Sequence, residues 1–124
     1  MKKIKVVLAD DHAVVRMGFR LLLQDTDDIE VIGEAKNGEE AIKICTETKP
    51  NVLVMDLSMP GMGGLEAIGR VLSKKDSPKV LILSAHEDTI HPKRALKAGA
   101  IGYLSKRGAA EELIKAIRQV SSGT

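Results

Sequence analysis

The chain contains 124 residues, of which 44% are hydrophobic and 29% are charged, and its formal net charge is +2. This length and composition are typical of one globular domain and argue against two domains of ordinary size. The weak charge does not indicate a nucleic-acid-binding surface, and no apolar run approaches the roughly 20 residues that span a bilayer.

The first residues do not resemble a targeting signal. Lys2 and Lys3 are followed by a strand-like run that soon reaches Asp10 and Asp11, which is not typical of a signal peptide. We therefore expect a cytoplasmic protein that does not associate with membranes.

Short apolar runs alternate with segments of helical periodicity, which is the pattern of a parallel sheet with helices on its faces. Two runs, at residues 5–8 and 80–83, are almost continuously apolar, as strands covered on both faces are. In chain order, the predicted strands are residues 4–9, 29–34, 52–55, 80–83 and 102–105.

Apolar residues also recur at helical spacing between the strands, so each intervening segment predicts a helix with an apolar face. The residues that share such a face are Val14, Met17 and Leu21; then Ala41, Ile44, Cys45 and Thr48; then Leu65, Ile68 and Leu72; and finally Leu113, Ile114, Ile117 and Val120.

Local signals mark the ends of two helices. Asn37 and Glu40 resemble a capping box, with Asn37 at the N-cap and Glu40 reaching back. The fourth helix, roughly residues 92–98, ends at Gly99, which can supply a left-handed turn. Cys45 is the single cysteine, which excludes a disulfide framework and a thiolate metal site, and we expect it to be a small buried residue.

Five strand and helix units joined by right-handed crossovers pack most simply as an open, doubly wound parallel sheet. We predict an α/β fold of the flavodoxin-like (βα)5 type with strand order 2-1-3-4-5. Ligands bind such sheets outside the carboxyl ends of the strands, where the strand order reverses. Polar residues stand at the predicted strand ends: Asp10 and Asp11, Glu34, Asp56, Ser84 and Lys106.

The carboxylates among these residues predict a cation site. In the predicted strand order Asp10 and Asp11 lie beside Asp56, and three carboxylates within a few ångströms repel one another unless a cation is present. Mg²⁺, with Mn²⁺ as a substitute, prefers such oxygen ligands. The backbone carbonyl of Ser58 is a further candidate ligand.

The same strand ends suit phosphoryl transfer. An aspartate can accept a phosphoryl group covalently, and Asp56 directly follows a predicted buried strand. Such transfer needs mainly alignment and neutralisation of charge on the phosphoryl oxygens. The cation, Lys106 and the hydroxyl of Ser84 are candidates to neutralise or bind those oxygens.

Four segments together carry a family resemblance. They are residues 7–12 (VLADDH), 15–18 (VRMG), 55–64 (MDLSMPGMGG) and 99–106 (GAIGYLSK). Over essentially the whole chain, this combination closely resembles the receiver domains of bacterial response regulators. It is most similar to the NarL/FixJ subfamily, whose members carry a C-terminal helix-turn-helix DNA-binding domain.

The resemblance implies a role for each site residue. Asp56 would be the phosphoacceptor, and Asp10 and Asp11 the acidic metal-binding pair. Ser84, which stands where threonine is commoner, would follow the phosphoryl group with its hydroxyl. Lys106 would pair with phosphate, and Tyr103 would be the aromatic switch residue that turns inward when Ser84 moves.

The resemblance also implies partners. A sensor histidine kinase would donate a phosphoryl group from phosphohistidine, and the modified chain would switch the face formed by helix four, strand five and helix five. The chain would thus be a switch and not a turnover enzyme, although it would assist its own phosphorylation and dephosphorylation. Homodimerisation on phosphorylation is a further expectation, with Lys93, Arg94, Lys97 and Arg118 as candidates to pair with acidic residues of a twin subunit.

We expect residues 1–121 to form the receiver domain. Residues 122–124 would be a tail or the start of a linker to a C-terminal output domain outside this chain. DNA would be bound only through that domain.

Two other functions share parts of this pattern. Haloacid-dehalogenase-type phosphatases also use a strand-end aspartate with Mg²⁺, but they place a second aspartate two residues later, where this chain has Ser58. A flavodoxin-like mononucleotide binder is disfavoured because only 2% of the residues are aromatic. The three histidines, His12, His86 and His91, share no metal-ligand spacing with one another or with Cys45.

Overall fold

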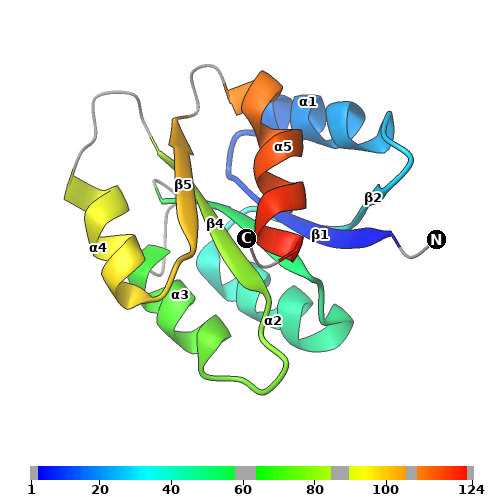
Figure 1. Ribbon diagram of the computed structural model, residues 1–124. Coiled ribbons are helices and arrows are strands. Elements are labelled where there is room, and N and C mark those ends of the chain that lie inside the picture. Colours follow the sequence, from blue (N-terminus) through cyan, green and yellow to red (C-terminus); the bar gives the residue numbers. More distant parts are fainter. Residues whose placement is uncertain (1–2, 58–63, 85–89, 106–108, 123–124) are drawn as a thin grey trace.

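The computed structural model describes residues 3–57, 64–84, 90–105 and 109–122. Across these residues, five parallel strands form one sheet in the order β2-β1-β3-β4-β5 (Figure 1). The strands are β1 (Ile4–Ala9), β2 (Ile29–Ala35), β3 (Val52–Asp56), β4 (Lys79–Ser84) and β5 (Gly102–Ser105). The predicted strand order is confirmed, and every predicted strand is present to within one residue at each end.

Five helices alternate with the strands in the described part of the chain. They are α1 (Ala13–Gln24), α2 (Gly38–Thr48), α3 (Gly64–Leu72), α4 (Ile90–Ala98) and α5 (Ala109–Ser122). Helices α1 and α5 cover one face of the sheet, and α2, α3 and α4 cover the other (Figure 1). No described helix has the length and apolar character needed to cross a membrane.

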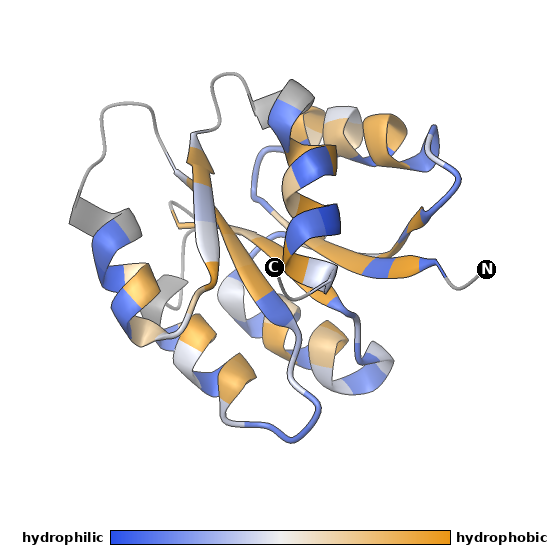
Figure 2. Cartoon of the chain, viewed as in Figure 1, coloured by the Kyte–Doolittle hydropathy of each residue, from blue (hydrophilic) through white to orange (hydrophobic). Residues whose placement is uncertain are grey.

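The central strands β1, β3 and β4 are buried on both faces, which explains their almost continuous apolar character (Figure 2). Successive side chains of a strand point to opposite faces, so Leu53 and Met55 of β3 pack toward α2 and α3, whereas Val52 and Val54 pack toward α1 and α5. The sheet thus separates two apolar clusters, one on each face.

Helix α1 is rotated away from the orientation that its periodicity predicts. Val14, Met17 and Leu21 do share one face, but that face is solvent-exposed, with 82%, 49% and 58% of each residue accessible. Phe19 and Leu23 pack on the sheet instead. Because α1 is apolar on both sides, its sequence alone does not determine an inward face, and the larger Phe19 is the side chain that the sheet buries.

The predicted cap of α2 is confirmed in its main contact. The Asn37 Oδ1 atom accepts a hydrogen bond from the Glu40 backbone N–H at 2.8 Å. The Glu40 carboxylate reaches back one residue further than predicted and accepts a hydrogen bond from the Lys36 N–H at 2.9 Å. Both contacts satisfy backbone donors near the start of the helix.

Ion pairs attach α1 to β2. The Glu34 carboxylate accepts hydrogen bonds from Arg16 Nε at 2.9 Å and from an Arg20 guanidinium N–H at 2.8 Å. Arg16 also donates to the backbone carbonyl of Asp10 at 2.6 Å, just after β1. Burial raises the pKa of the Glu34 carboxyl, but the hydrogen bonds from Arg20 and Arg16 outweigh burial, so that its pKa lies below the ordinary value of 4.5.

A second link joins α5 to the segment before β2. Arg118 donates two hydrogen bonds to the Asp28 carboxylate, at 2.8 and 2.9 Å. Arg118 was a candidate partner for acids of a twin subunit, and in this structure it pairs within its own chain.

Replacing Gly99 should destabilise the fold. Gly99 follows α4 with φ +118°, and a Cβ atom here would lie 2.5 Å from Leu72 Cδ1. We expect Gly99→Ala to lower the free energy of unfolding by about 1–3 kcal/mol, because a non-glycine residue at positive φ is strained. Urea titration checks the loss.

Gly18→Ala is the matched control. Gly18 lies within α1, and a Cβ there would meet nothing within 4 Å, so this change should stabilise the helix by about 0.5–1 kcal/mol. Equal unfolding free energies for the wild type and Gly99→Ala would contradict the backbone argument.

The Glu34 cluster makes stability depend on pH. We expect Glu34→Gln to lower the free energy of unfolding near neutral pH by about 1–2 kcal/mol, because two guanidinium groups lose a charged acceptor. The folded-state pKa lies below the ordinary value of 4.5, so the carboxylate stabilises the fold above pH 4.5 and ceases to do so as the pH falls through the folded pKa. The difference between variant and wild type should therefore shrink below that pH.

The comparison for this variant is Glu66→Gln, which breaks the exposed pair of Glu66 with Arg70 in α3. Exposed pairs of this kind contribute only about 0–0.5 kcal/mol. Equal decreases in the free energy of unfolding for the two variants across the pH range would show that the Glu34 cluster stabilises the fold no more than an exposed ion pair does.

Candidate functional site

The carboxyl ends of β1 and β3 bring two acidic residues together. Ala9 and Met55 are paired in the ladder between these strands, so Asp10 and Asp56, each one residue further on, lie side by side. The Asp10 backbone N–H is also held by the Ala35 carbonyl of β2 at 2.9 Å. Both acids are buried, with 2% and 0% of each residue exposed.

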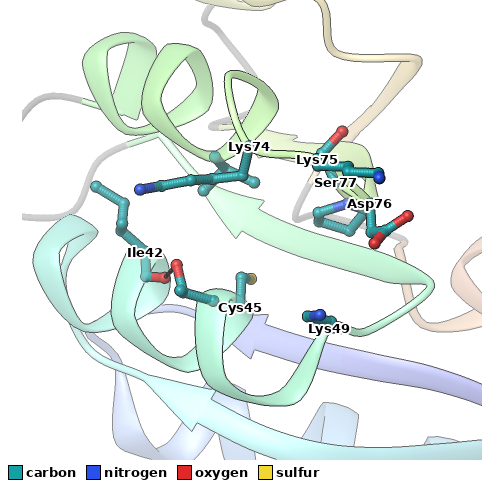
Figure 3. Close-up of a pocket in the computed structure, with 10 residues that line it drawn as sticks. Ile42, Cys45, Lys49, Lys74, Lys75, Asp76 and Ser77 are labelled. Carbon is teal, nitrogen blue, oxygen red and sulfur yellow. Dashed lines mark hydrogen bonds between the residues drawn. The ribbon is translucent and has the colours of Figure 1, made fainter.

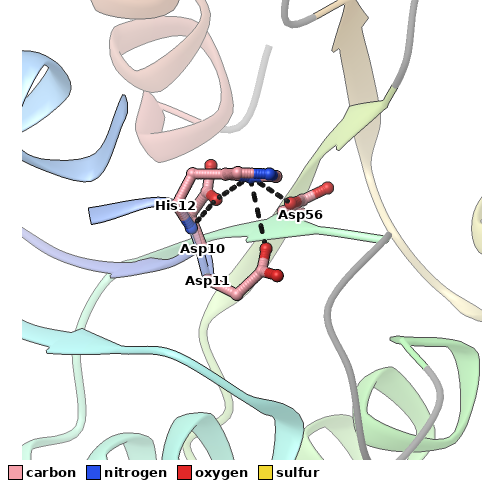
Figure 4. A group of neighbouring side chains, drawn as sticks. All are labelled: Asp10, Asp11, His12 and Asp56. Atoms are coloured by element: carbon pink, nitrogen blue, oxygen red, sulfur yellow. Dashed lines mark hydrogen bonds and ion pairs between the residues drawn. The ribbon is translucent and has the colours of Figure 1, made fainter. Parts of the chain in front are cut away.

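Asp11 and His12 complete a group of four side chains. Each of Asp10, Asp11, His12 and Asp56 offers one ligand atom, and these atoms all lie within 4.8 Å of one another (Figure 4). The predicted meeting of Asp10, Asp11 and Asp56 is therefore present. A compact set of oxygen donors, two of them buried carboxylates, suits a hard divalent cation, because a cation offsets their mutual repulsion.

His12 is the member of this group that sequence reasoning missed. Its Nδ1 atom lies 3.1 Å from Asp10 Oδ1, 3.3 Å from Asp11 Oδ1 and 4.0 Å from Asp56 Oδ2. The spacing rules for metal sites compare histidines and cysteines with one another, so they overlook a histidine that lies among carboxylates. The signal in the sequence was the position of His12 directly after Asp10 and Asp11 and directly before the first helix. In this fold, residues between a strand and the next helix lie at the carboxyl edge of the sheet.

Ser84 and Tyr103 occupy contrasting environments on the neighbouring strands. Ser84 ends β4 and is buried, with 4% exposed. Leu83, just before it, is paired with Asp56, so Ser84 lies beside the acidic group. Tyr103 of β5 is 52% exposed. Lys106 and Ser58 lie outside the described residues, so their predicted roles stay predictions.

A different pocket, of about 180 Å³, lies between the C-terminal ends of α2 and α3 (Figure 3). Ile42, Cys45 and Val71 contribute apolar lining, and Lys49 and Lys74 are among its polar lining residues. This pocket is at the amino ends of β3 and β4, and thus at the edge of the sheet opposite to the carboxylates. Cys45 is buried as predicted, and burial raises its pKa to about 12, so the thiol is protonated and unreactive.

Comparisons with known proteins agree with this geometry. The family model of the response regulator receiver domain matches residues 6–118. The response regulator UvrY of Escherichia coli K12 is 45% identical over 120 residues, which are 97% of this chain and 55% of UvrY. The chain thus spans about half the length of the curated relatives it matches.

Solved structures show the same fold. The receiver domain of the response regulator NarL from Mycobacterium tuberculosis superposes with a TM-score of 0.93 at 33% identity, and the match covers 100% of both chains. A structure described as a DNA-binding response regulator of the LuxR family, from Staphylococcus aureus, has a TM-score of 0.87 at 29% identity, and the match covers 95% of this chain and 98% of that one.

These matches give no support to a haloacid-dehalogenase-type phosphatase. The sheet order, the buried acids at its carboxyl edge and the family match over nearly the whole length lead to one assignment. This chain belongs to the receiver domains of two-component response regulators, which are signalling proteins.

Proposed function

We propose that Asp56 accepts a phosphoryl group from the phosphohistidine of a sensor kinase, with Mg²⁺, or Mn²⁺ in its place, held by Asp10, Asp11 and Asp56. The observation that carries this proposal is the convergence of three carboxylates at one edge of the sheet. The backbone carbonyl of Ser58 is the proposed fourth ligand. The proposed setting is the cytoplasm.

Transfer of the phosphoryl group from phosphohistidine to Asp56 needs no further reactant. An oxygen of the Asp56 carboxylate forms a bond to phosphorus as the bond from phosphorus to the donor's imidazole nitrogen breaks. The backbone of Asp56 is fixed in β3 between two neighbouring strands, so the nucleophile is aligned before the donor arrives. When bound, the cation supplies positive charge that offsets the carboxylates and a phosphoryl oxygen.

Two further side chains complete the proposed site. Lys106 pairs with a second phosphoryl oxygen, and the Ser84 hydroxyl donates to a third. Ser84 is buried and follows Leu83, the partner of Asp56 in the ladder, which supports this role for its hydroxyl. The chain thereby assists its own phosphorylation and dephosphorylation but does not turn over a substrate.

The signal leaves the site through α4, β5 and α5. A phosphoryl group on Asp56 stabilises the state in which Ser84 has moved toward it, and Tyr103, half-exposed here, turns inward. The altered face favours a homodimer and controls a helix-turn-helix output domain that binds DNA and regulates transcription. The similarity to NarL and to LuxR-family response regulators supports this output.

The exposed face of α1 is the proposed contact for the kinase. Val14, Met17 and Leu21 form an apolar stripe on a helix that begins directly after His12. Apolar side chains exposed together mark interaction surfaces. A helix of the donor that packs on this stripe would bring its phosphohistidine over the carboxylates.

Asp56 should be the residue that is modified. We expect incubation with acetyl phosphate and Mg²⁺ to add one phosphoryl group to the wild type and none to Asp56→Asn, because the amide is a poor nucleophile. Intact mass spectrometry measures the adduct, and chelation of Mg²⁺ should slow its formation roughly tenfold or more. Steady release of phosphate without an adduct would instead support a phosphatase.

The same samples test the dimer. The solution mass of the treated wild type should rise toward that of two chains, and that of Asp56→Asn should not. A phosphorylated chain that remains monomeric would remove dimerisation from the proposal.

The α1 stripe should matter for a protein donor only. We expect Met17→Ser combined with Leu21→Ser to slow transfer from a phosphorylated histidine-kinase core roughly tenfold or more, because the few apolar residues at the centre of an interface each cost about 1 kcal/mol or more when truncated. Labelling by acetyl phosphate, which needs no docking helix, should be unchanged.

Leu96→Ser is the matched control for the stripe. Leu96 is an exposed leucine on α4, 39% accessible, and its loss should not slow transfer. Slowing of both donors by the α1 double variant would indicate damage to the site and not to a docking surface.

A further inference from the structure

His12 is placed where a cation ligand would stand. Its backbone is fixed, because its carbonyl accepts the Arg16 N–H at 2.9 Å and it is the N-cap residue of α1. Its backbone N–H donates to Asp10 Oδ1 at 2.8 Å. The side chain makes no cap hydrogen bond to the helix and instead turns its Nδ1 atom toward the acids (Figure 4).

The distances around Nδ1 match those between ligands of one ion. Two ligand atoms about 2.1 Å from the same ion lie about 3.0 Å apart at a right angle and about 4.2 Å apart when opposite. Nδ1 lies 3.1 and 3.3 Å from oxygens of Asp10 and Asp11 and 4.0 Å from an oxygen of Asp56. Small movements of these side chains would suffice to enclose one ion with all four atoms.

We propose that His12 supplies a nitrogen ligand to the ion at the carboxylates and so widens the selectivity of the site from Mg²⁺ to ions of the Zn²⁺ class. This inference rests on the proposed cation site and adds a specificity-determining residue to it. Oxygen donors and water suit Mg²⁺, whereas imidazole favours Zn²⁺ and other later transition ions. The addition of Nδ1 to the three carboxylate oxygens therefore strengthens the binding of Zn²⁺ and leaves that of Mg²⁺ nearly unchanged.

The ring has the freedom that coordination needs. To bind the ion through Nδ1, the neutral ring carries its proton on Nε2. The His12 side chain is 58% exposed, so it can reorient by small rotations without disturbing a packed core. Coordination forms only the bond between Nδ1 and the ion, and no covalent bond of the chain changes.

Calorimetric titration with MgCl2 and, separately, ZnCl2 tests the proposal on wild type and His12→Gln. Glutamine keeps a polar side chain and removes the imidazole nitrogen, and the helix cap does not depend on the side chain. We expect the variant to lose roughly tenfold or more in Zn²⁺ affinity and to change less than about twofold for Mg²⁺. The double variant His86→Gln, His91→Gln is the control and should retain the wild-type Zn²⁺ affinity.

Nitrogen NMR of histidine-labelled protein gives a direct readout. Zn²⁺, which is diamagnetic, should shift the Nδ1 resonance of His12 in the wild type, and the buried Cys45 thiol should not compete. An unshifted His12 resonance, or equal Zn²⁺ affinities of wild type and His12→Gln, would overturn the inference. A chain that binds Mg²⁺ and forms the Asp56 adduct in that case would leave the proposed function intact, whereas failure of both would contradict the function itself.

Discussion

The candidate site depends on keeping two buried carboxylates side by side. Asp10 and Asp56 follow adjacent parallel strands and are almost inaccessible to solvent, so their charges repel in a region that water screens poorly. A positive charge close to both carboxylates would lower this repulsion. The proposed cation would offset that repulsion, and the imidazole of His12 faces the same carboxylates.

The rest of the fold holds the acids still. The central strands β1, β3 and β4 are buried between two apolar clusters, and each cluster includes helices from one side of the sheet. Arg16 donates hydrogen bonds to the carbonyl of Asp10 and to the carboxylate of Glu34. The segment after β1 is therefore linked both to α1 and to β2. Such support matters because sub-ångström placement of ligands decides whether a cation and a donor fit together.

Exposure is distributed in a way that suits a switch. Asp56 and Ser84 are buried, whereas Tyr103 of β5 and the apolar residues Val14, Met17 and Leu21 of α1 face solvent. In the proposed function, α1 would receive an incoming protein next to the site, and the surface around β5 would change after modification. The proposed input and output surfaces thus lie on different parts of the domain.

The sequence by itself determined the sheet, its order and the meeting of Asp10, Asp11 and Asp56, because strand periodicity and crossover handedness bring all carboxyl strand ends to one edge. It also indicated the Asn37 cap, the turn at Gly99 and the burial of Cys45, which depend on local chemistry. Only the tertiary structure decided which face of α1 is buried, since that helix is apolar on both sides and the fit of Phe19 against the sheet selects its rotation. It alone placed His12 among the carboxylates and Arg118 on Asp28, because contacts between side chains depend on distances in space that spacing along the chain does not encode.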